Sequence, residues 1–144
     1  MVENLAIIGP VFALAAWTLA MLLLVAFRRV HAARAGEVHP REFALGDSLK
    51  VPTSVALANR NYMNLLELPV LFYVACLASL LIGAATAGML ALAWIYVALR
   101  VAHSLIHVTY NRIIHRFAVF ALSNVVLMAL WVLLGLQAVG KHAA

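Results

Sequence analysis

Residues 5–27 read LAIIGPVFALAAWTLAMLLLVAF and contain no charged side chain. A helix needs about 20 consecutive apolar residues to cross the hydrocarbon core of a bilayer, so this stretch is long enough to span it. Comparable apolar runs cover about residues 52–82, 89–110 and 113–139. The sequence therefore predicts an all-α integral membrane protein, built as a four-helix bundle.

Composition supports the same fold class. Of the 144 residues, 67% are hydrophobic and 10% are charged, and the mean hydropathy of +1.04 lies far above that of soluble domains. This length accommodates four spans with short connections, so we expect one transmembrane domain over residues 1–144. Cys76 is the single cysteine, which excludes an internal disulfide.

The distribution of basic residues predicts an orientation. The formal charge of +5 and the pI near 10.0 come from Arg and Lys that flank the apolar runs, which favours membrane orientation over nucleic-acid binding. Residues 28–50 form the long basic connection, a second basic turn carries Arg112 and Arg116, and residues 83–88 carry no charge. The positive-inside rule then places both basic connections in the cytoplasm and both termini outside. We expect a multi-pass protein of a bacterial inner membrane.

Charged residues inside the second run form a stripe. Arg60, Asn64 and Glu67 are spaced i, i+4 and i+7, which places them within a sector of roughly 60° on a helix. Charges within a span cost about 2.5 to 3.5 kcal/mol each on insertion scales and usually face a cavity or a partner. Pro69 removes an amide from the helical ladder and predicts a kink next to this stripe.

A second polar stripe lies in the third run, and two interpretations of the pair remain open. Its residues recur at intervals of three and four: Arg100, His103, Ser104, His107 and Asn111. If the stripes meet, Glu67 pairs with Arg60 or Arg100 in a structural network between helices. Alternatively, four arginines (Arg60, Arg100, Arg112 and Arg116) against one carboxylate indicate an anion site.

The two histidines of the second stripe have the spacing of a helical metal pair. His103 and His107 are i and i+4, which allows both rings to reach one ion. No cysteine or acidic residue stands at a useful spacing from them. We therefore expect no metal.

The chain resembles the MAPEG family, the membrane-associated proteins of eicosanoid and glutathione metabolism. The pattern Arg60-x-x-x-Asn64-x-x-Glu67, with Pro69 and Phe72 after it, resembles the family's second-helix signature. The run Arg100-Val101-Ala102-His103, followed by His107, Arg112 and Arg116, is similar to the third helix and turn of the prostaglandin E synthase branch. Phe27-Arg28-Arg29 looks like the end of the first helix in leukotriene C synthase.

The resemblance implies a homotrimer that holds glutathione between protomers near the cytoplasmic face. It implies Arg60, Asn64, Glu67, Arg100, His103, His107 and Arg112 as cofactor-binding residues. Arg116 matches the arginine that lowers the pKa of the glutathione thiol and is the expected catalytic residue, with Arg112 as the alternative. The expected activity is that of a glutathione transferase or peroxidase acting on a lipophilic electrophile from the membrane lipid.

Two departures from the family leave a second function open. His107 stands where glutathione-dependent members carry a tyrosine, and Leu68 stands where leukotriene C synthase has one. The loss of two phenols favours a non-catalytic membrane protein that binds or presents lipid. A small transporter or channel subunit is a third interpretation, although a second intramembrane acid for a proton relay is missing from the sequence.

Overall fold

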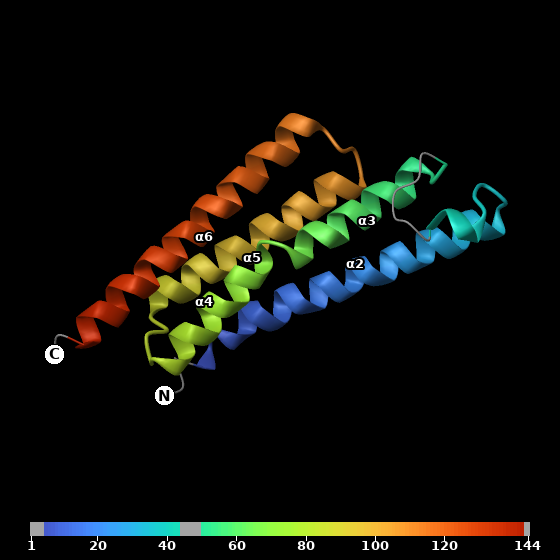
Figure 1. Cartoon of the computed structure of the whole chain (residues 1–144). Helices are drawn as coiled ribbons and strands as arrows, with labels where there is room; N and C mark the ends of the chain where they lie inside the picture. The colour runs from blue at the N-terminus through green and yellow to red at the C-terminus, as the bar shows by residue number, and fades with distance from the viewer. Residues whose placement is uncertain (1–4, 44–49, 143–144) are drawn as a thin grey trace.

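The computed structural model describes residues 5–43 and 50–142 and contains four helical spans (Figure 1). Its elements are α2 (Ile8–Arg34), the 3-10 helix η1 (Pro40–Phe43), α3 (Thr53–Leu66), α4 (Pro69–Leu81), α5 (Ala87–Val108) and α6 (Ile113–His142). Together α3 and α4 form the second span. The predicted all-α membrane bundle is confirmed, and the start of α2 and the end of α6 lie at the same end of it.

The first helix is longer than the sequence indicates. It continues about two turns beyond residue 27, to Arg34, because the residues that follow are mostly Ala and Arg, which favour a helix. It ends where Gly36 adopts a φ of 73°, the left-handed conformation that commonly terminates helices. The predicted loop over residues 28–50 is therefore partly helix, and its residues 44–49 lie outside the described part of the chain.

The second span is broken beside Glu67. Since Pro69 has no amide proton, it occupies the first turn of a new helix, and α3 ends at Leu66. Glu67 takes a φ of −87° and a ψ of −101°, outside the helical region. The kink predicted from Pro69 is thus present as a complete interruption, and it separates a polar α3 from an apolar α4.

The third and fourth helices differ from the prediction at their ends. Helix α5 begins at Ala87, where the Thr86 Oγ1 accepts the Met89 amide at 3.4 Å, and ends at Val108 rather than Tyr110. Helix α6 runs to His142 rather than to residue 139. Asn111 lies in the turn between them with a φ of 46°. The polar stripe of α5 therefore ends at His107, and Asn111 does not belong to it.

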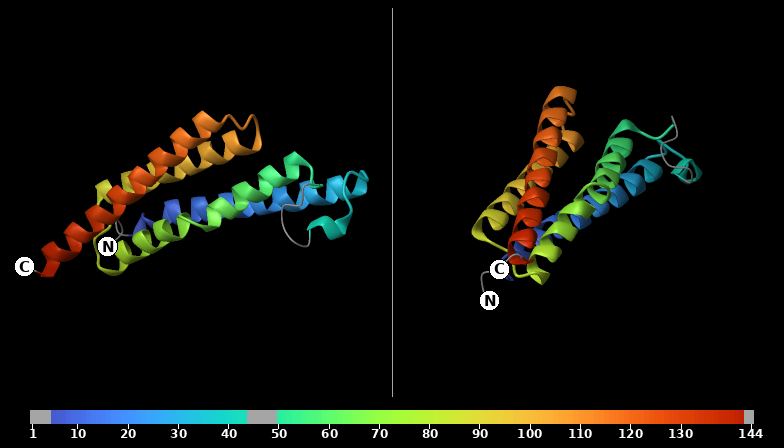
Figure 2. Two further views of the ribbon diagram at one scale, coloured as in Figure 1. Left: turned by 45° about the horizontal axis from the view of Figure 1, so that its top comes forward. Right: turned by 60° about the vertical axis from the view of Figure 1, so that its left-hand side comes forward.

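The helices associate as two pairs, α2 with α3 and α5 with α6 (Figure 2). A hydrophobic core joins the pairs in the half of the bundle that contains the termini. There the rings of Phe72 and Tyr96 stack at 4.7 Å, and Leu14, Met89 and Leu130 are fully buried. Towards the other end α6 diverges from α3, as both views show. The polar stripes lie at this diverging end.

Arg28 of the first helix connects the two pairs near the diverging end, and Arg29 strengthens the contact within the first pair. The Arg28 guanidinium donates through Nη1 to the Ser54 carbonyl at 2.7 Å and through Nη2 to the Val108 carbonyl at 3.2 Å. Arg29 Nη2 donates to the Asn59 Oδ1 at 3.0 Å. Because these bonds reach the start of α3 and the end of α5, they fix the separation of the helices that carry the polar stripes.

The orientation of the bundle is tested by thiol labelling of intact cells. In a Cys76→Ala background, single cysteines would replace Ala35, just beyond α2, or Ala87, at the start of α5; both positions are exposed and neither has a positive φ. We expect a membrane-impermeant maleimide to label the Ala87 position from outside and to label the Ala35 position only after permeabilisation. The reverse pattern would contradict the cytoplasmic placement of the basic connections.

Candidate functional site

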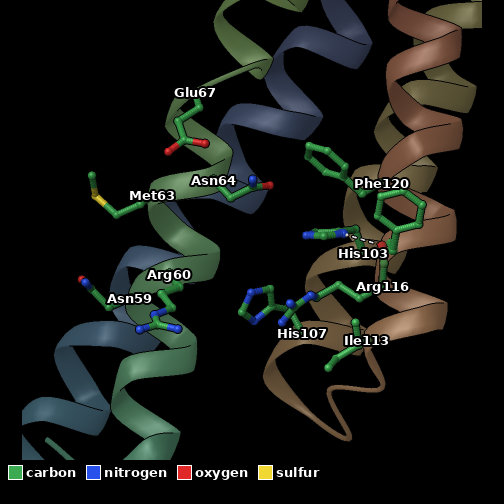
Figure 3. A pocket seen from close by; sticks show the side chains of 11 residues that line it. Asn59, Arg60, Met63, Asn64, Glu67, His103, His107, Ile113, Arg116 and Phe120 are labelled. Carbon is green, nitrogen blue, oxygen red and sulfur yellow. Dashed lines mark hydrogen bonds between the residues drawn. The ribbon is translucent and has the colours of Figure 1, made fainter. Parts of the chain in front are cut away.

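A cavity of about 460 Å³ opens between α3 and the first turns of α6 (Figure 3). Helix α5 forms its floor. We call this cavity the polar groove, and its lining residues are Asn59, Arg60, Met63, Asn64, Glu67, His103, His107, Ile113, Arg116, Phe117 and Phe120. The volume falls within the range of roughly 300 to 1,000 Å³ that is typical of small-molecule sites.

The wall contributed by α3 is polar. Arg60, Asn64 and Glu67 lie one above the other along the helix, as their spacing predicts, and Glu67 projects into the groove from the break before Pro69. Glu67 is exposed and makes no ion pair within the described residues. The ion pair found there joins Lys50 to Glu42, at 3.2 Å. The predicted network between Glu67 and the arginines is therefore not formed in this protomer, and the carboxylate faces the cavity.

The floor contributed by α5 carries two histidines, His103 and His107, which are 4% and 6% exposed. His103 Nδ1 lies 3.2 Å from the Arg116 carbonyl oxygen. Since a carbonyl oxygen only accepts hydrogen bonds, Nδ1 must carry the proton. In the neutral ring, Nε2 is then unprotonated, and Figure 3 shows this nitrogen turned towards the groove.

The wall contributed by α6 combines one cation with an apolar surface. Arg116 Nη1 donates to the Asn111 Oδ1 at 2.6 Å, so the turn residue orients the guanidinium. Asn111 can do this because asparagine tolerates the left-handed conformation, which its amide bond to the Ile106 carbonyl at 2.8 Å helps to hold. Phe117 and Phe120 complete the wall, and Phe117 is 68% exposed.

A fully buried arginine supports the groove from behind. Arg100 is 0% exposed, and its Nη2 donates to the backbone carbonyl of Asn64 at 2.8 Å and to its Oδ1 at 2.5 Å. The guanidinium also lies 5.7 Å from the centre of the Phe120 ring, within reach of a cation–π interaction. Arg100 therefore joins α5 to α3 and α6 and adds positive charge behind the cavity.

The structure brings together most of the residues expected at the site. Six of them line the groove: Arg60, Asn64, Glu67, His103, His107 and Arg116. Arg100 lies behind the groove, against Asn64. Arg112 is exposed and does not line the cavity. Of the two arginines considered for the thiol, only Arg116 thus faces the groove.

Sequence reasoning did not identify the apolar part of the site. Ile113, Phe117 and Phe120 recur at helical spacing with Arg116, but in a membrane helix this pattern is indistinguishable from a surface that contacts lipid. Met63 was overlooked for the same reason. Asn111 is visible in the sequence only as a polar residue near the turn, and its contact with Arg116 depends on the backbone conformation.

The fold and the groove together define a four-helix membrane protein with a partly charged cavity between its helix pairs. The chain matches the sequence model of the MAPEG family over residues 7–136. Because this match covers nearly the whole chain, the protein belongs to the MAPEG family. No curated protein and no solved structure matches the chain in the comparisons made.

The contact between Asn64 and Arg100 is tested by Asn64→Leu. This change removes the Oδ1 acceptor from a guanidinium with no access to water, so we expect the free energy of unfolding to fall by about 1.5 to 3 kcal/mol. Met63→Leu is the matched control, because Met63 is the preceding residue and is half exposed. Reversible denaturation in mixed micelles measures both, and equal stability of the two variants would contradict the supporting role of Asn64.

Proposed function

We propose that this protein is a glutathione-dependent enzyme of the bacterial inner membrane, a transferase or peroxidase acting on lipophilic electrophiles. The observation that carries the proposal is the composition of the polar groove. Two guanidinium groups, one carboxylate and two asparagine amides face an apolar aromatic wall in a single cavity. The MAPEG family, to which the chain belongs, includes glutathione transferases and peroxidases.

Glutathione is complementary to the polar side of this groove. It carries two carboxylates, one ammonium group and two peptide bonds. Arg60 provides a bidentate donor for a carboxylate, and Glu67 provides an acceptor for the ammonium group. The Asn64 side chain lies between these charges and Asn59 lies beyond Arg60; since arginines already donate to both Oδ1 atoms, their amide nitrogens are the groups that suit peptide carbonyls. The unpaired carboxylate of Glu67 favours a cationic group on the ligand, which a simple anion lacks.

Arg116 is the group proposed to activate the thiol. A guanidinium beside the sulfur stabilises the thiolate relative to the thiol and so increases the reactive fraction at neutral pH. Asn111 holds the Arg116 guanidinium in a fixed position, so little reorganisation is required when the charge develops. The thiolate then attacks an electrophilic carbon in a transferase or a peroxide oxygen in a peroxidase.

The apolar wall suits a substrate that arrives from the lipid. Ile113 and Phe117 are 71% and 68% exposed, and they lie on α6 where it diverges from α3. In a membrane, such exposed apolar side chains contact lipid chains. A lipophilic electrophile can therefore move laterally past them and reach Arg116 without crossing water.

We propose further that the active form is a homotrimer with glutathione between protomers. Glutathione has two carboxylates. If Arg116 serves the thiol, Arg60 is the one remaining arginine among the described residues that line the groove, and it can bind one carboxylate. The second carboxylate then requires a cation from outside the described groove. An adjacent protomer that covers the groove beside Arg60, and leaves Ile113 and Phe117 in contact with lipid, supplies it.

The alternative function is a non-catalytic protein that binds or presents membrane lipid. It was suggested by the two missing phenols, at His107 and Leu68. Leu68 packs against the hydrophobic core and does not line the groove, so only the change at His107 affects the site. A histidine retains a hydrogen-bonding group there, and the enzymatic proposal is therefore favoured.

Separate roles for Glu67 and Arg116 provide a test. We expect Glu67→Gln to weaken glutathione binding by roughly ten- to a hundredfold, the loss of one charged hydrogen bond in a partly desolvated site. Arg116→Ala should leave affinity within a few-fold but lower turnover, because removal of the cation destabilises the thiolate. Calorimetry gives the binding constants, and ultraviolet absorbance across a pH titration gives the fraction of thiolate.

Two comparison variants sharpen this test. Glu37→Gln removes an exposed carboxylate outside the groove, and Arg112→Ala removes the neighbouring arginine that does not line it. Both should bind and react as the wild type does. An unchanged thiolate titration in Arg116→Ala would remove Arg116 from the mechanism, and a large effect in Arg112→Ala would transfer the role to that residue.

The trimer is tested by native mass spectrometry of the protein released from detergent, combined with binding measurements at increasing dilution. We expect a trimer, and we expect glutathione affinity to decline as the trimer dissociates, because each site would lose its second carboxylate partner. A monomer that retains full affinity would contradict a site shared between protomers.

A further inference from the structure

We infer that His103 is the proton acceptor for the ligand thiol and that its Nε2 receives the proton directly. This inference rests on the proposed use of glutathione and adds a catalytic base to it. It is carried by the hydrogen bond of the opposite ring nitrogen and by the position of the ring on the groove floor. Arg116 alone stabilises a thiolate but offers no site for the proton that leaves.

The tautomer of His103 is set by the protein. Its Nδ1–H donates to the Arg116 carbonyl oxygen at 3.2 Å, which leaves the lone pair of Nε2 available in the neutral ring. The ring is held further by Phe120, whose ring centre lies 5.6 Å away. A base of this kind needs a fixed tautomer and a position that faces the ligand cavity, and His103 has both.

One residue of α6 supplies both parts of the arrangement. The Arg116 carbonyl orients the His103 ring, and the Arg116 guanidinium lines the same cavity. In Figure 3 the tip of the Arg116 side chain lies beside the His107 ring, and the His103 ring lies further along the same floor. We place the sulfur on this part of the floor, between the Arg116 guanidinium and Nε2 of His103. The thiol, His103 and the Arg116 carbonyl would then act as nucleophile, base and orienting group. In this arrangement a backbone carbonyl takes the place of the carboxylate that usually orients the base.

The other titratable groups of the groove are less suited to this role. His107 Nδ1 is buried and has no hydrogen-bond partner in the described structure, so no contact selects its tautomer. Glu67 projects from the break after α3, on the opposite wall, where the proposed ammonium group requires its negative charge. His103 is left as the groove base whose tautomer a hydrogen bond fixes.

The proton balance of a conjugate addition can be followed completely. The S–H bond breaks, its electron pair remains on sulfur, and the proton forms a second N–H bond on His103, at Nε2. The thiolate then forms a C–S bond with the terminal carbon of an electrophilic alkene, and the electron pair of the double bond moves to the adjacent carbon. That carbon takes the proton from Nε2, which restores the neutral ring.

Two substitutions of His103 separate the base from its structural contact. In His103→Asn the amide nitrogen stands close to the place of Nδ1 and can still donate to the Arg116 carbonyl, but no base remains. In His103→Ala the base and the hydrogen bond to the Arg116 carbonyl are both lost, and added imidazole can occupy the vacated space. His115→Gln is the control, since His115 lies on the same turn of α6 as Arg116, is exposed, and does not line the groove.

The measurements are glutathione affinity by calorimetry, and thiolate formation (by ultraviolet absorbance) and turnover with a generic electrophilic alkene by stopped-flow. We expect His103→Asn to bind glutathione within a few-fold of wild type but to form the thiolate and turn over about 100- to 10,000-fold more slowly. Imidazole should restore part of the rate in His103→Ala and have no effect on wild type. His115→Gln should retain wild-type rates.

The outcomes distinguish this inference from the proposed function. If wild-type protein does not bind glutathione, the proposed function fails, and the assignment of His103 fails with it. If the wild type binds and reacts but His103→Asn forms the thiolate at the wild-type rate, the base is overturned and the proposed function stands. Lack of rescue of a folded, glutathione-binding His103→Ala by imidazole would also overturn the base.

Discussion

A charge in the hydrocarbon layer must have a partner or access to a polar cavity, and the architecture of this protein follows from that constraint. Arg100 meets this constraint in part: its Nη2 donates to both oxygens of Asn64 and its guanidinium lies within cation–π reach of Phe120, while Nε and Nη1 have no hydrogen-bond partner in the described structure. Arg60, Glu67 and Arg116 satisfy it by facing a shared cavity. The hydrogen bonds from Arg100 to Asn64 also attach α5 to α3. They offset part of the free-energy cost of burying the guanidinium, and they hold the helices that line the groove.

The cavity exists because the two helix pairs are joined at one end and diverge at the other. The apolar core around Phe72 and Tyr96 joins the pairs, and the interruption before Pro69 separates apolar α4 from polar α3. Arg28 then bonds to carbonyls near the start of α3 and at the end of α5, which keeps these segments at a fixed spacing. These contacts hold the polar groove open between the two helix pairs.

The sequence was sufficient to predict the spans and both polar stripes, because apolar length and helical spacing are local properties. It was sufficient to place Glu67 beside a kink, since Pro69 cannot continue a helix. It did not predict that α2 extends to Arg34, because polar residues after an apolar run resemble a loop even when they continue the helix. Residue periodicity alone does not give the end of the helix.

Other features of the site depend on tertiary structure. Arg112 and Arg116 are equivalent by composition, and only the path of the turn exposes one and directs the other into the groove. The left-handed conformation of Asn111 and its bond to Arg116 have no signature in a single sequence. Likewise, Phe117 and Phe120 look like lipid-facing residues until α3 is placed opposite them.

The central claim is that the groove between α3 and α6 holds glutathione, with its peptide on the polar wall and its sulfur at Arg116. A crystal structure of the protein with S-hexylglutathione tests this most directly, because the alkyl chain marks the position of the sulfur and the path of a lipophilic substrate. The account predicts the ligand's ammonium group at Glu67, its sulfur beside Arg116 and His103, and its hexyl chain along Phe117. A ligand bound elsewhere, with this groove empty, would contradict it.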